Sequence, residues 1–126
     1  MSITFTVPGD PVPKGRPRSV VSASGRLRTY TPRRTQDYEA EIGAEWIAAR
    51  KTYAPFGGPV SLLIAVFEKR HPADLDNYVK VVLDALNGLA FEDDKQVEEL
   101  HATIERKADT PGITVTVSTI EEVLSA

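Results

Sequence analysis

The sequence predicts an α/β protein of the α+β type: a mixed β-sheet of about four strands with two main helices, in the order β-α-β-α-β-β. Two segments, 31–53 and 75–90, repeat apolar residues at helical spacing. Hydrophobic residues make up 41% of the 126 positions, which suits one packed core, so we expect a single domain over residues 1–126. The strands are expected in segments that alternate in polarity or are apolar throughout, namely 3–7, 60–67, 97–107 and 113–120.

The first strand is followed by a strongly basic segment. ITFTV (3–7) alternates apolar residues with threonine, and the prolines and glycine of 8–13 then stop regular structure. Residues 11–34 form a long loop or irregular hairpin that turns at SASG (22–25). They contain no acidic residue, and such a single-signed run favours a polyanion such as nucleic acid over a merely solvated loop. The candidate DNA-binding residues here are Lys14, Arg16, Arg18, Arg26, Arg28, Arg33 and Arg34.

The first helix is expected to begin at Thr31-Pro32, with threonine as the N-cap and proline at the first helical position. It would run to about Tyr53. Two arginines in its first turn oppose the helix dipole, and a bound anion would offset that effect. One apolar face carries Tyr38, Ile42, Trp46, Ala49 and Tyr53.

The second half of the chain adds three strands and a helix. VSLLIAVF (60–67) is apolar on both faces, which is typical of a central strand that is covered on both sides. A helix over 75–90 follows. VEELHATIERK (97–107) and ITVTVSTI (113–120) both alternate, and the turn at 109–112 between them predicts a hairpin.

The second helix carries an unusual set of charges. On a helical wheel, an apolar stripe is formed by Val79, Val82, Leu83, Leu86 and Ala90. A polar stripe lies directly beside it rather than opposite, so we expect it to line a cleft, and it contains Asp76, Lys80, Asp84 and Asn87. Asp74 comes just before the helix and within reach of the same edge.

A second pair of carboxylates, Asp93-Asp94, follows this helix and is expected to pass along the mouth of the sheet. Carboxylates that converge repel one another unless a cation or proton joins them, and Mg²⁺ prefers such oxygen ligands. Each piece also has a plain structural interpretation: Asp74 or Asp76 as an N-cap, Asp84 paired with Lys80, and Asp93-Asp94 as a turn.

Several classes are excluded by what the sequence lacks. There are no cysteines, which rules out disulfides and thiolate metal sites and fits a reducing cytoplasm. No EF-hand loop, Walker loop or H-E-x-x-H motif is present. We expect no transmembrane helix, because no run of about 18 apolar residues occurs, and no signal peptide at MSITFTVPGD.

The strings DLDNYVKVVLDALNG and FEDDKQV, together with the opening VPGDPVPKGRPR, resemble the RusA-type Holliday junction resolvases over roughly residues 3–117. The resemblance implies a homodimer that binds four-way DNA junctions and cuts two strands symmetrically with Mg²⁺ or Mn²⁺. It assigns catalysis to Asp74, Asp76, Asp94 and Lys80, with Asp93 as a further metal ligand. Basic residues of the N-terminal region are expected to bind DNA, and Lys69 and Arg70 join them as candidates.

The residues support this chemistry independently. Carboxylate-held Mg²⁺ can activate water and stabilise the charge of a scissile phosphate, and Lys80 shares a stripe with Asp76. Two alternatives stay open: a non-catalytic nucleic-acid-binding module, and a nuclease of the same chemistry that prefers other branched DNA. The basic segment is longer than in the best-known family member, so no preference for a cut-site sequence is carried over.

Overall fold

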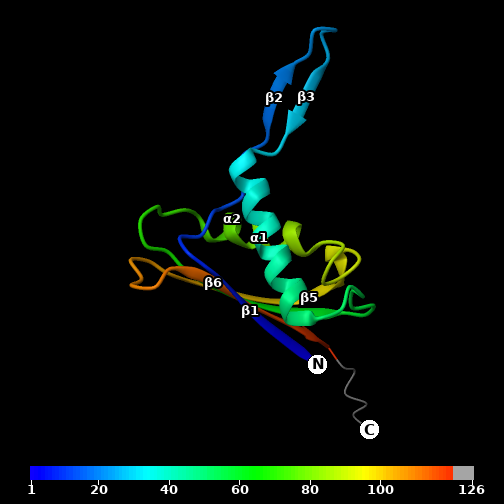
Figure 1. Ribbon diagram of the computed structural model, residues 1–126, viewed down its shortest axis with the longest axis vertical. Coiled ribbons are helices and arrows are strands. Elements are labelled where there is room, and N and C mark those ends of the chain that lie inside the picture. The colour runs from blue at the N-terminus through cyan, green and yellow to red at the C-terminus, as the bar shows by residue number, and fades with distance from the viewer. Residues whose placement is uncertain (121–126) are drawn as a thin grey trace.

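The predicted sheet and helices are present in the computed structural model, which describes residues 1–120 (Figure 1). Neither helix within that range is long and apolar enough to cross a membrane. A short 3₁₀ helix, η1 (Asp94–Gln96), follows the second α-helix. The strands and α-helices are β1 (Ser2–Pro8), β2 (Arg18–Val21), β3 (Leu27–Tyr30), α1 (Arg33–Arg50), β4 (Val60–Phe67), α2 (Leu75–Leu86), β5 (Val97–Glu105) and β6 (Gly112–Thr119).

The main sheet is mixed and has the strand order β1-β6-β4-β5. β4 pairs antiparallel with β6 and parallel with β5, and β1 pairs antiparallel with β6. The mixed four-stranded sheet is therefore confirmed, but the predicted hairpin of 97–107 with 113–120 is wrong, because β4 lies between these strands. Alternation identifies a strand without identifying its partner, and here the apolar β6 takes an inner position while the more polar β5 takes an edge.

Within residues 1–120 the helices cover one face of the sheet and leave the other open, so this part of the chain forms two layers (Figure 1). Alternate residues of β4 are buried beneath the helices, whereas Leu63 on the other face is 49% exposed. The expectation that β4 is covered on both sides is therefore wrong for the described chain. Beside β4, the open face carries hydroxyl pairs between β1 and β6, such as Thr4 with Thr116 at 2.8 Å.

α1 supplies much of the core, with Tyr38, Ile42 and Trp46 buried as predicted. Its ends differ from the prediction. The N-cap is Pro32 rather than Thr31, and no side chain caps the helix. The helix stops at Arg50 because the next residue takes a left-handed conformation, which leaves Tyr53 beyond the helix and 81% exposed.

The basic segment forms a hairpin that projects away from the sheet and helices (Figure 1). We call residues 18–30 the arm. It consists of β2 and β3, and every residue of both strands is exposed. The turn lies at 22–25 as predicted, closed by a hydrogen bond from Gly25 N to Ser22 O. The arm thus presents its arginines on a surface that makes no contribution to the core.

Candidate active site

α2 is shorter than predicted and is rotated relative to the predicted wheel. It ends at Leu86, because Asn87 caps it and Gly88 reverses the chain with φ 85°. Its buried face contains Tyr78, Val81, Val82, Ala85 and Leu86, while Val79 and Leu83 are only half-buried. Tyr78 shifts the centre of the buried face, because its hydroxyl has a partner inside the protein. Asp76 and Lys80 consequently lie on the exposed side of α2 rather than at the edge of the core.

Asp84 lies at the edge of the core, where it forms an ion pair with Lys14. The Lys14 ammonium is 3.0 Å from Asp84 Oδ2 and 3.1 Å from Glu39 Oε2, and it therefore joins α2 to α1. Burial alone would lower the pKa of Lys14, but hydrogen bonds to both carboxylates outweigh it and raise that pKa. The expected pair of Lys80 with Asp84 is present at 3.8 Å, so Asp84 is shared. The partnership with Lys14 was missed because seventy residues separate the two.

Asp74 and Asp76 stand together at the N-terminus of α2. Asp74 occupies the N-cap position, but its side chain makes no capping hydrogen bond, and its carbonyl accepts the N–H of Asn77 at 3.1 Å. Asp76 lies in the first turn and both residues are exposed. Asp74 therefore does not cap α2 through its side chain, and the Asp74 carboxylate oxygens face solvent.

Asp93 and Asp94 divide into a capping residue and an exposed one. The Asp93 carboxylate accepts the Lys95 N–H at 2.9 Å, which holds the pKa of Asp93 below its usual range. Gln96 completes a capping box by accepting the Asp93 N–H, and it also anchors the turn by donating to the Phe56 carbonyl at 2.7 Å. Asp94, in the first turn of η1, is exposed.

The two acidic pairs lie at opposite ends of the sheet (Figure 1). β4 and β5 are parallel, with Val60 beside Val97 and Phe67 beside Glu105. Asp74 follows the Phe67 end, whereas Asp94 precedes Val97 at the other end. The 12 residues of α2 between them span about 18 Å. The expected convergence within one chain is therefore wrong, and among residues 1–120 no three acidic or histidine side chains form a group that could hold a metal ion.

The basic candidates gather at the Asp74 end of α2. The base of the arm is tied there, because Lys14 N donates to Asn77 O at 2.9 Å and Gly15 N donates to Thr35 Oγ1 at 3.0 Å. Arg33 and Arg34 begin α1 beside this base, and Lys69 and Arg70 are exposed in the loop before Asp74. Of the predicted DNA-binding residues, Lys14 is held by two carboxylates, and Arg33 pairs with Asp37 at 3.3 Å on the exposed start of α1. For the others, DNA binding stays a prediction.

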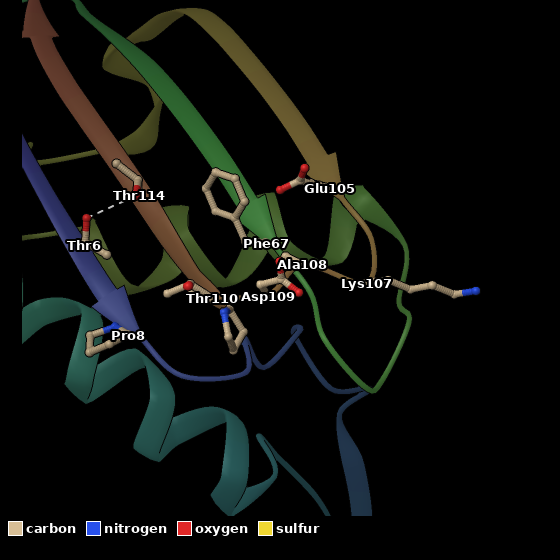
Figure 2. Close-up of a pocket in the computed structure, with 11 residues that line it drawn as sticks. Thr6, Pro8, Phe67, Glu105, Lys107, Ala108, Asp109, Thr110 and Thr114 are labelled. Atoms are coloured by element: carbon tan, nitrogen blue, oxygen red, sulfur yellow. Dashed lines mark hydrogen bonds between the residues drawn. The ribbon is translucent and has the colours of Figure 1, made fainter.

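A hollow of about 530 Å³ lies on the open face of the sheet and contains none of the predicted site residues (Figure 2). Thr6, Phe67 and Thr114 lie along the strands that form its floor, Glu105 lies at the end of β5, and Asp109 lies beside Thr110, while Lys107 points away. The hollow is on the opposite side of the sheet from α2. Its position therefore separates it from Asp74, Asp76 and Lys80.

Comparison with known proteins agrees with the motif-based prediction. The family described as "Endodeoxyribonuclease RusA" matches residues 8–118, and this is a family of Holliday junction resolvases that act on branched DNA. The chain is also 32% identical over 120 residues to the uncharacterized protein YqaN of Bacillus subtilis (strain 168), across 78% of this chain and 83% of YqaN. Enzymes of this family are hydrolases that cut DNA internally. The chain belongs to the RusA endodeoxyribonuclease family.

Proposed function

We propose that this protein is a Mg²⁺-dependent endonuclease that resolves four-way DNA junctions by paired, symmetric phosphodiester cuts in recombination and repair. The observation that carries the proposal is the pair of exposed, non-capping carboxylates at the start of α2, directly beside the base of a basic arm. Binding DNA along the arm would bring a phosphate to Asp74 and Asp76. A DNA substrate of this kind also favours a location in the cytoplasm.

The residues fit a hard divalent cation. Asp74, Asp76 and Asp94 offer oxygen ligands that no helix cap uses, which suits Mg²⁺ or Mn²⁺, while the Asp93 carboxylate is engaged by η1 and is a weaker candidate. A bound ion would activate water and stabilise the charge of the scissile phosphate. Lys80 is one turn after Asp76 on the same exposed side, so its ammonium can contact that phosphate.

A homodimer would bring Asp94 of one chain close to the Asp74 and Asp76 pair of the other. Among the described residues β5 is an edge strand of the sheet, and Leu100, in register with the buried Leu62, is 47% exposed. Antiparallel pairing of β5 with its copy would place the start of one strand beside the end of the other. Asp94 of one copy would then approach Asp74 and Asp76 of the other. A two-fold dimer also provides the two symmetric sites that paired cuts require.

The proposal is tested by cleavage of synthetic branched DNA. We expect a four-way junction to be cut in Mg²⁺ or Mn²⁺ and left intact in EDTA, with linear duplex resistant in both. The comparison needs one salt concentration throughout, because binding to phosphates falls steeply with salt. Binding of the junction without metal-dependent cutting would favour the non-catalytic module. Faster cutting of flaps or forks than of junctions would favour the alternative branched substrate.

Replacing both Arg26 and Arg28 by glutamine is expected to weaken junction binding and lower the salt dependence of log K by about two. Both residues are exposed on the arm, so the free energy of unfolding should stay unchanged. Binding measured at several salt concentrations gives the slope. Lys51→Asn is the control, because it removes one charge at the far end of α1 and keeps a residue that tolerates φ 63°. If Lys51→Asn lowers the salt-dependence slope by as much per charge removed, the arm is not a preferred site of DNA contact.

A further inference from the structure

Glu68 is a carboxylate buried at the end of β4, with only 2% of its surface exposed. It receives three hydrogen bonds. Oε2 accepts from the Tyr78 hydroxyl and from the Ala73 N–H at 2.8 Å, and Oε1 accepts from Arg106 Nη1 at 2.7 Å. Leaving a buried carboxylate without partners is costly, whereas satisfied charges of this kind hold their surroundings in one arrangement. Glu68, Ala73 and Arg106 lie outside the motifs that carry the family resemblance, whereas Tyr78 lies within DLDNYVKVVLDALNG.

The bonds of Glu68 join the end of β4 to α2, to the end of β5 and to the residues that follow β5. Its own N–H donates to the Glu105 carbonyl at 2.9 Å, and its carbonyl accepts the Ala108 N–H at 2.7 Å. Arg106 also donates to the Ala73 carbonyl at 3.2 Å, so the residue before Asp74 is held through both its N–H and its C=O. The loop 69–73, which carries Lys69 and Arg70, is thereby fastened to β4 and β5.

We propose that Glu68 is a positioning residue, and that its carboxylate fixes Asp74 and Asp76 for metal and phosphate binding; this rests on the proposed function. The supporting geometry is that Glu68 binds both ends of the segment 73–78, an arrangement that we call the bracket. Ala73 comes directly before Asp74 and Tyr78 comes two residues after Asp76, and one Glu68 oxygen, Oε2, binds both. The two exposed carboxylates are thus carried on a segment whose ends share a single buried acceptor.

Tyr78 is suited to a permanent role as donor. Burial, and then the hydrogen bond and negative charge of Glu68, raise the pKa of the Tyr78 phenol well above its usual value. Its hydroxyl therefore keeps its proton at the pH values at which nucleases are assayed. Tyr38 offers a matched comparison on α1: it is equally buried, yet within residues 1–120 its hydroxyl has no hydrogen-bond partner.

Tyr78→Phe tests the bracket, with Tyr38→Phe as the control. In the full-length protein without DNA, we expect hydrogen exchange of the Ala73 amide to accelerate about tenfold in Tyr78→Phe, because its acceptor loses its neighbouring donor. Mn²⁺ titration followed by electron paramagnetic resonance should show about tenfold weaker binding. Tyr38→Phe should match the wild type in both measurements, and Glu68→Gln should reproduce the Tyr78→Phe effects if it folds.

The outcomes separate this proposal from the proposed function. If the wild-type protein neither binds Mn²⁺ nor cuts junctions, the proposed nuclease function itself is wrong. Wild-type protein that does both, with Tyr78→Phe unchanged in Ala73 exchange and in Mn²⁺ affinity, would overturn the positioning role. Faster exchange with unaltered Mn²⁺ affinity would overturn it as well, because Glu68 would then only stabilise the loop. A lower kcat with unchanged junction affinity is the kinetic result that positioning predicts.

Discussion

Asp76→Asn is expected to lower the rate of junction cleavage in Mg²⁺ by about 10³-fold or more, while junction affinity stays within about threefold of the wild type. Losing one carboxylate ligand forfeits several kcal/mol of transition-state stabilisation, and each 1.36 kcal/mol is a factor of ten in rate. Binding should survive because Asp76 is exposed and takes no part in the core or in a helix cap. Single-turnover cleavage and a gel-shift titration measure the two quantities separately.

The control for this variant is Asp109→Asn, which removes a carboxylate from the hollow on the open face, away from α2. It should cut at the wild-type rate. Thermal unfolding of both variants should match the wild type, since both side chains are exposed. An Asp76→Asn protein that still cuts while it no longer binds junctions would reverse the assignment of Asp76 from catalysis to binding. Equal losses in both variants would point to general electrostatics instead of a metal site.

Periodicity alone was enough to predict the two helices and four strands of the sheet, because each buries a face with a recognisable spacing. Pairing was not predictable from it. β5 alternates as a hairpin strand does, yet its hydrogen bonds go to β4 across the α2 crossover. β4 is apolar on both faces, and the sequence does not say that the helices cover only one of them. The arm was predicted only as a loop or irregular hairpin because its strands bury nothing.

The candidate site residues were chosen by residue type, and the structure places Asp94 farther from Asp74 and Asp76 than expected. The spacing of Asp74, Asp76 and Lys80 is set by one helix and its N-cap, so it can be predicted without the tertiary structure. Asp94 was expected at the same mouth, because the chain between it and the helix is short. A parallel strand must begin at the end where its neighbour begins, so the crossover carries Asp94 to the far end. The pairing of Lys14 with Asp84 and the role of Glu68 were not predicted for a related reason, since their partners are distant in sequence and ion pairing has no period.

Mixing Asp76→Asn with Asp94→Asn is expected to restore cleavage that neither variant has alone. If each site takes Asp76 from one chain and Asp94 from the other, a mixed dimer carries both substitutions in one site and neither in the second. Random exchange of subunits leaves about a quarter of all sites intact. The recovered activity should appear as nicks rather than paired cuts, because a mixed dimer has one working site. Nicked and resolved products of a labelled junction are distinguished on native and denaturing gels.

The mixing experiment decides between two explanations of how Asp94 could share a site with Asp74 and Asp76. If Asp74, Asp76 and Asp94 of one chain closed together on metal binding, a mixed dimer would have one defect in each site and would stay inactive. A parallel mixture of Asp76→Asn with Asp74→Asn controls for simple dilution effects. These two residues share one end of α2, so every mixed site keeps a defect under either explanation. Recovery in the first mixture and none in the second therefore requires a site built from both ends of α2 on different chains.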